Sequence, residues 1–147
     1  MNSNLSYAAI MLAAGIGIPV LAALNSALGA RIGSPATSVA ILFTIAFSGA
    51  WVIAALSGFS GLSAVASAPK HLLLAGLLVL FYVLSITIIA PKFGVGNAVF
   101  FVLVGQIISA TIIDHFGLFG ANVSQINWSR ASGLALMVAG IGLTRLT

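Results

Sequence analysis

Five long apolar stretches follow one another along the chain, separated by short polar or glycine-rich connections. About 20 residues of helix, at 1.5 Å each, cross the roughly 30 Å hydrocarbon core of a bilayer. Each stretch is long enough for one crossing, so the pattern predicts an all-α integral membrane protein with five transmembrane helices in a single domain, residues 1–147. The predicted spans are residues 5–28, 35–56, 71–90, 97–116 and 129–146.

The connections between the spans carry helix-start and helix-stop signals. Ser34 is placed to cap the second span, with Pro35 at its first helical position. Pro91 is expected to close the third span. Residues 57–69 are rich in Ser, Gly and Ala and predict a loop, to which the sequence gives no functional interpretation.

Composition supports the membrane assignment. The chain is 61% hydrophobic and 4% charged, whereas a soluble domain has about 25% charged residues. The five Lys and Arg residues stand singly, so the formal charge of +4 indicates anchors at membrane ends and not a nucleic-acid surface. The first apolar run lacks a preceding basic region and is about 20 residues long, so it predicts a span and not a signal peptide.

The sequence argues against an enzyme. It has one acidic residue and no cysteine, no zinc-binding motif, and no Ser/His/Asp arrangement at usable spacing. We therefore expect no catalytic residues, no metal site and no cofactor.

Gln106 is the polar residue that packing explains least easily. It falls at the middle of the fourth span, where its amide must face protein, a water-filled cavity or a ligand. Ser109 lies on the same face. We predict both as solute contacts.

Asn25 and Tyr82 are further candidates for solute binding. Asn25 lies towards the end of the first span, where it either lines a pathway or makes a hydrogen bond between helices. Tyr82 lies near the middle of the third span, and its hydroxyl needs a partner.

The first span also contains Gly15, Gly17 and Pro19. Pro19 has no backbone N–H and leaves the carbonyl of Gly15 without its usual donor. We expect a kink or local unwinding, which is either a tolerated irregularity or part of a gate.

Asp114 is the single acidic residue and lies near the end of the fourth span. The helix macrodipole disfavours an anion there, so a cationic partner is expected. Arg130 is the candidate within the chain, and Arg31, Lys92 or Arg145 are candidates from an inverted second copy.

Small residues recur along the fifth span at Ser129, Gly133 and Gly140. Their spacing of four and seven residues places them near one face, where they would let a second helix approach closely. The alternative is that they are ordinary glycines of a membrane helix.

Basic residues barely distinguish the two sides of the membrane. With five spans, Lys70 and Arg130 lie on the side of the N-terminus, and Arg31, Lys92 and Arg145 lie on the other. Orientation follows such asymmetry, so this balance predicts a chain that inserts in both directions or one that is oriented only weakly. Oppositely oriented copies are related by an axis in the membrane plane, as in inverted-repeat transporters.

Four motifs, Asn25–Pro35, Ile89–Gly94, Gly105–Gln106 and Asp114–Gly117, in this order and spacing, resemble the YdcZ-type family of the drug/metabolite transporter superfamily in bacterial inner membranes. The resemblance covers nearly the whole chain. It implies a ten-helix fold of two inverted five-helix halves, formed by a fused chain, a pair of different chains or a dual-topology homodimer. The balanced basic residues favour the antiparallel homodimer.

The resemblance implies a multi-pass secondary transporter of the inner membrane that works by alternating access on a small-molecule solute. Related four-span multidrug transporters keep a glutamate in the first span, whereas this first span has no carboxylate. We therefore expect a small polar or anionic metabolite and not a permanent cation. The alternatives are a non-transporting scaffold or accessory subunit, and one half of a heterodimeric transporter.

Overall fold

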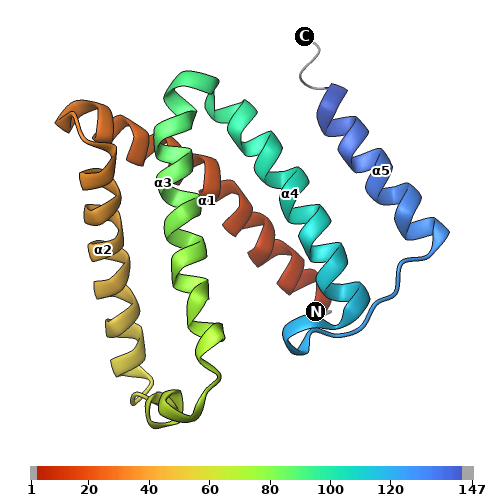
Figure 1. The fold of residues 1–147 in the computed structure, drawn as a ribbon, viewed down its shortest axis with the longest axis horizontal. Coiled ribbons are helices and arrows are strands. Elements are labelled where there is room, and N and C mark those ends of the chain that lie inside the picture. Colours follow the sequence, from red (N-terminus) through yellow and green to blue (C-terminus); the bar gives the residue numbers. More distant parts are fainter. Residues whose placement is uncertain (1–2, 144–147) are drawn as a thin grey trace. The chain divides into compact units, whose positions relative to one another are not determined.

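A computed structural model describes residues 3–143, and these residues form helices and connections without any strand. The predicted all-α class is confirmed. In chain order (Figure 1) the elements are α1 (Ser3–Ile32), α2 (Pro35–Leu56), the 3₁₀ turns η1 (Leu62–Ser67) and η2 (Lys70–Leu74), α3 (Ala75–Phe93), α4 (Val95–Phe116), η3 (Leu118–Gly120) and α5 (Trp128–Leu143).

Four helical stretches are long and apolar enough to cross a membrane: Asn4–Ile32, Pro35–Leu56, Lys70–Phe93 and Val95–Phe116. The described part of α5 is apolar but shorter, at 16 residues. The predicted end of the fifth span, Leu146, lies outside the described residues.

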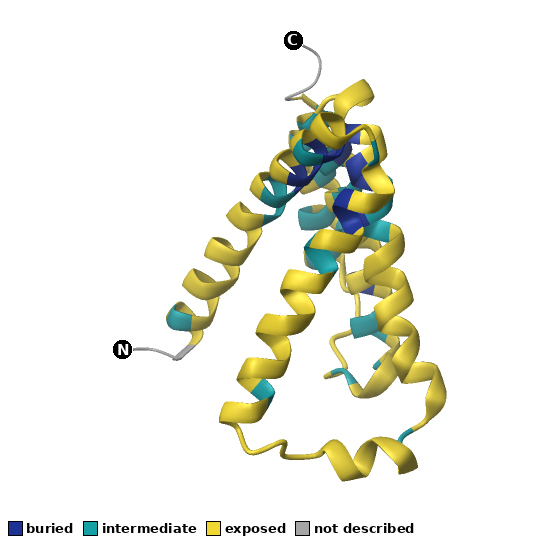
Figure 2. Ribbon diagram, turned by 90° about the vertical axis from the view of Figure 1, so that its left-hand side faces the viewer, coloured by how far each residue is buried: buried dark blue, intermediate teal, exposed yellow. Residues whose placement is uncertain are grey.

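Residues 1–95 and 96–147 form two compact units, each described here by itself. In the first unit, α1, α2 and α3 pack together at one end. Its buried apolar residues come from the second half of α1, the start of α2 and the end of α3, and Figure 2 shows them gathered at that end: Ala22, Val39, Val83, Ile86 and Ala90.

The first half of α1 has a different environment. Large apolar side chains such as Leu5, Ile10 and Leu12 are each more than 60% exposed. A Cβ atom added at Gly15 or Gly17 would meet nothing within 4 Å. Within its own unit, therefore, this half of α1 carries almost no protein cover.

The end of α1 lies close to the start of α2. Ser34 caps α2 as predicted, accepting a hydrogen bond from the Thr37 backbone N–H at 3.2 Å. A Cβ atom at Gly29 would lie 3.2 Å from both Pro35 Cα and Ser38 Oγ. Glycine at position 29 therefore sets how near the two helices come.

Two expectations about proline need correction. The helix α1 continues through Pro19 without a break, so local unwinding, one of the two outcomes expected there, is absent, while the expected kink stays a prediction. Pro91 lies inside the last turn of α3 and does not end it. The helix extends to Phe93 and stops at Gly94, whose φ of 90° breaks the helical path.

In the second unit, α4 ends at Gly117 in a left-handed conformation with φ of 61°. A Cβ atom at this position would lie 2.7 Å from Val123 Cγ2. The chain then passes through η3 and an irregular segment to α5. Asn127 begins α5, its side-chain oxygen accepting from the Arg130 backbone N–H at 2.8 Å.

Candidate functional site

Asn25 holds helices together. Its side-chain Nδ2 donates to Thr87 Oγ1 on α3 at 2.8 Å, and its backbone oxygen accepts from Ser38 Oγ on α2 at 3.0 Å. The residue is 5% exposed. Of the two roles considered for Asn25, the described contacts show the hydrogen bond between helices.

Asn25 also borders a groove of about 300 Å³ between α1 and α2. The other residues that line it are leucines and isoleucines, among them Leu21, Leu28 and Ile41. One amide in an apolar groove offers a polar solute little else to bind.

Thr87 is the polar residue that sequence reasoning missed. Its carbonyl is four residues before Pro91, which has no N–H to donate to it. Ser26 Oγ donates to this carbonyl at 3.3 Å, while Thr87 Oγ1 donates to the Val83 carbonyl at 2.7 Å. The position of Pro91 was the available signal, because a proline inside a membrane helix leaves one carbonyl to be satisfied by a neighbour.

Tyr82 lies near the middle of α3 with a buried hydroxyl oxygen. This oxygen has no hydrogen-bond partner in the part of the chain that the structure describes. Ser85, three residues along the same face, likewise has no recorded side-chain hydrogen bond. A buried phenol is normally hydrogen-bonded, so this hydroxyl is open to a partner from outside its unit.

Gln106 is exposed at the middle of α4, and no hydrogen bond is recorded for its side chain within the described residues. Successive helical residues turn by about 100°. Gln106 therefore lies on the side of α4 opposite Ile108 and Thr111, which line a groove of about 550 Å³ against α5. The amide faces away from the one helix that shares its unit.

Ser109 has a local role. Its hydroxyl donates to the backbone oxygens of Gly105 and Gln106, at 2.9 and 3.2 Å. Such back-bonding is common for serine in helices and leaves one acceptor for a ligand. Of the pair on this face, Gln106 is the side chain free to bind.

The four predicted solute contacts divide between the two units. Asn25 and Tyr82 belong to the first unit, and Gln106 and Ser109 belong to the second. Within the first unit Asn25 bonds to Thr87 and Tyr82 has no partner, so these two side chains are not hydrogen-bonded to each other.

Asp114 and Arg130 form an ion pair across the connection between α4 and α5. Arg130 NH2 lies 2.5 Å from Asp114 Oδ2, and the two side chains are 29% and 39% exposed. Arg130 NH1 also donates to the backbone oxygen and the hydroxyl of Ser124, both at 2.6 Å. Arg145, a candidate partner from a second copy, lies outside the described residues.

The same connection is held by two backbone donors. The N–H of Ser124 donates to the Asp114 carbonyl at 2.8 Å, and the N–H of Ile126 donates to His115 Nδ1 at 3.1 Å. Together with the ion pair, these bonds fix the segment after Gly117 against the end of α4. The arrangement is structural, and the carboxylate is already paired.

The small-residue stripe of α5 is open. A Cβ atom at Gly133 or Gly140 would meet nothing within 4 Å. The face of α5 towards α4 carries Leu134 and Val138, and the rotation of about 100° per residue places Ser129, Gly133 and Gly140 on the opposite side. No helix of the second unit packs on this stripe.

The family model described as "Putative inner membrane exporter, YdcZ" matches residues 6–143. This range contains every candidate residue discussed above except Arg145. No curated protein and no solved structure matches the chain.

Proposed function

Because the chain belongs to the YdcZ family of inner-membrane exporters, we propose that two oppositely oriented copies form one secondary transporter. The antiparallel homodimer exports a small polar or anionic metabolite by alternating access. Each copy supplies one five-helix half, and Gln106 is the principal solute contact, assisted by Tyr82.

The unpartnered amide of Gln106 carries this proposal. An amide at mid-membrane with no hydrogen bond is costly in hydrocarbon. The side chain is exposed and faces away from α5, so its partner comes from outside its own unit. A polar solute in a water-filled cavity between two copies satisfies it. The buried hydroxyl of Tyr82, on α3, likewise lacks a hydrogen-bond partner in the described residues.

Three features support a second copy. The basic residues give the chain almost no preferred orientation. The Gly133 and Gly140 stripe has open space above it, and close packing of such stripes is a usual helix contact in membranes. The first half of α1 also has little cover from its own unit.

The charges favour a solute that is not a cation. The chain has one carboxylate, and Arg130 neutralises it at the end of α4. A cationic solute would find no free carboxylate among the described residues at mid-membrane. Amide and phenol groups instead suit a neutral polar solute, or an anion that accepts hydrogen bonds.

Transport by the purified protein is the test. The chain is reconstituted alone into proteoliposomes, and movement of a panel of small neutral, anionic and cationic metabolites is measured against protein-free vesicles. Transport of a neutral or anionic solute that Gln106→Leu abolishes is expected. No transport in either membrane orientation would indicate an accessory subunit or a missing different partner, and transport limited to cations would contradict the proposed solute class.

A further inference from the structure

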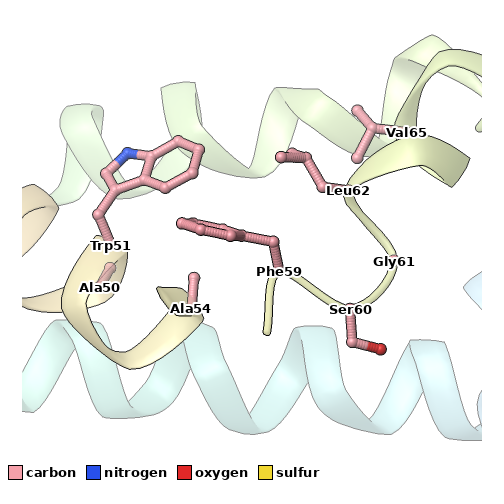
Figure 3. A pocket seen from close by; sticks show the side chains of 8 residues that line it. All are labelled: Ala50, Trp51, Ala54, Phe59, Ser60, Gly61, Leu62 and Val65. Carbon is pink, nitrogen blue, oxygen red and sulfur yellow. The ribbon is translucent and has the colours of Figure 1, made fainter. Parts of the chain in front are cut away.

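An apolar groove of about 370 Å³ lies where α2 ends and the following turn begins. Figure 3 shows Phe59 projecting towards Trp51 across the groove, with Leu62 and Val65 on the far wall and Ser60 at the edge. The ring centroids of Trp51 and Phe59 are 6.0 Å apart. All of these residues belong to the first unit. Trp51 lies in α2, and the others lie within residues 57–69, the loop without a functional interpretation from the sequence.

A turn with three residues of positive φ forms one side of this groove. Gly58, Phe59 and Gly61 all have positive φ, at 70°, 52° and 83°. Positive φ is unfavourable for phenylalanine. The turn is held by the Phe59 N–H, which donates to the Ala54 carbonyl at 2.9 Å. The strained turn brings the Phe59 ring back to the last turns of α2.

The groove lacks protein cover in the described residues. Trp51, Phe59, Leu62 and Val65 are between 42% and 51% exposed. The helix α2 has 22 residues, or about 33 Å, which is the thickness of the hydrocarbon core. Its end therefore lies at the membrane interface, where tryptophan is typically found.

Positive charge stands beside the groove. Lys70 Nζ donates to the Ala66 carbonyl at 3.1 Å, and Ala66 directly follows Val65 of the groove wall. Lys70 is the one charged residue between Ile32 and Pro91, with His71 next to it. No carboxylate in that stretch neutralises it. The Ser60 hydroxyl has no recorded hydrogen bond in the described residues.

From the apolar groove and the unneutralised Lys70 beside it, we propose that this site binds one anionic phospholipid. Its acyl chain lies against Trp51 and Phe59, and its phosphate is held by Lys70 with Ser60 as a further donor. Basic residues close to a membrane surface attract anionic lipids in this way. The inference does not depend on transport activity.

Trp51 provides the measurement. The chain has two tryptophans, and Trp128→Phe leaves Trp51 as the single indole reporter. The full-length protein is placed in vesicles of equal parts phosphatidylglycerol and phosphatidylcholine, with bromine on the acyl chains of one lipid or the other. Brominated phosphatidylglycerol is expected to quench Trp51 with an apparent affinity about fivefold higher than brominated phosphatidylcholine, the preference that one basic residue gives.

Two pairs of variants distinguish the effect of the Lys70 charge from the effect of the groove's shape. Lys70→Gln is expected to remove the preference, whereas Lys92→Gln, its matched control, keeps it. Ala54→Leu fills the groove and should reduce quenching by both lipids, whereas Ala46→Leu on the exposed side of α2 should not. Equal quenching by the two lipids in the parent protein would overturn the proposal. So would an unchanged preference in Lys70→Gln, or relief of quenching by millimolar inorganic phosphate, which would indicate a free-anion site.

Discussion

The hydroxyl of Ser26 on α1 donates to the carbonyl of Thr87 on α3 at 3.3 Å, and that carbonyl is the one that Pro91 leaves without a backbone donor. A helix defect in α3 is thus satisfied by a side chain of α1. The neighbouring Asn25 bonds the hydroxyl of the same threonine. The two contacts tie α1 to α3 at the buried end of the first unit.

This relationship predicts a coupling between two residues far apart in sequence. Ser26→Ala should destabilise the protein by about 1 kcal/mol, the scale of hydrogen bonds in membrane proteins, because the Thr87 carbonyl loses its donor. In a Pro91→Ala background the restored backbone N–H can replace Ser26, so the effect should largely vanish. Unfolding in mixed micelles of increasing denaturing detergent measures the double-mutant cycle.

Ser48→Ala is the control for this cycle, since Ser48 Oγ bonds only the Thr44 carbonyl of its own helix at 2.8 Å. It should change stability little. If Ser26→Ala lowers stability equally with and without Pro91, the serine does not compensate for the backbone donor that the proline lacks.

Asn25 and Gln106 should respond in opposite ways to the same substitution. Asn25→Leu removes a buried bond to Thr87 and should lower stability by about 0.6–1.7 kcal/mol. Gln106→Leu removes no recorded internal bond and should leave the melting temperature unchanged, while abolishing transport and any stabilisation by solute. Thermal unfolding with and without a transported solute tests both. A lower melting temperature for Gln106→Leu without solute would assign this residue to helix packing.

Gly29 should tolerate no added methyl group. A Cβ atom there lies 3.2 Å from the Pro35 backbone, which cannot move without shifting the start of α2. Gly29→Ala should therefore cost about 1–3 kcal/mol, as overpacking does. Gly15→Ala in the same helix meets open space and is the matched control. Equal stabilities of the two variants, measured by detergent unfolding, would contradict the close approach.

The ion pair of Asp114 and Arg130 should stabilise mainly the segment between α4 and α5. Arg130→Gln removes the contacts to Asp114 and Ser124 and should increase protease cleavage within residues 117–127. The effect on global stability should be small, because partly exposed ion pairs contribute about 0–1 kcal/mol. Lys92→Gln serves as the charge-matched control. Unchanged cleavage of Arg130→Gln would show that Gly117 and the backbone bonds hold the segment without the ion pair.

Dual insertion should be visible directly. The chain has no cysteine, so a single cysteine in place of Phe93, exposed at the end of α3, can be labelled from outside intact cells. We expect labelling of about half of the copies, and a shift to one state when two or three lysines are added on one side. Labelling of all copies from one side would exclude the antiparallel homodimer.

The α5 stripe offers a separate test of the dimer. Gly133→Leu places a bulky side chain where no described residue lies, so the monomer should fold normally. The dimer fraction should fall if the stripe is its interface. Gly142→Leu is the matched control, because a Cβ atom there also meets nothing within 4 Å and Gly142 lies on the other side of α5. An unchanged dimer fraction in lipid would place the stripe against the bilayer.

The sequence by itself determined the class of protein and the approximate helices. Apolar length and the near absence of charge identify membrane spans, because hydrocarbon admits only backbone that satisfies its own hydrogen bonds. The cap at Ser34 was predicted because it depends on local geometry, whereas the end of α3 was expected at Pro91 and lies at Gly94. The sequence also limited the ion-pair partner of Asp114 to Arg130 or a basic residue of an inverted copy, because a lone carboxylate at a helix end requires a cation.

Only the tertiary structure decided which polar residues are already bonded. Asn25 and Gln106 are both amides within membrane helices, and no local pattern distinguishes them. Helix rotation brings Asn25 to Thr87 and turns Gln106 away from α5, and this rotation follows from packing between distant segments. The turn that brings Phe59 to Trp51 likewise depends on positive φ at a phenylalanine. Residue preferences oppose that conformation, so the sequence could not reveal the groove.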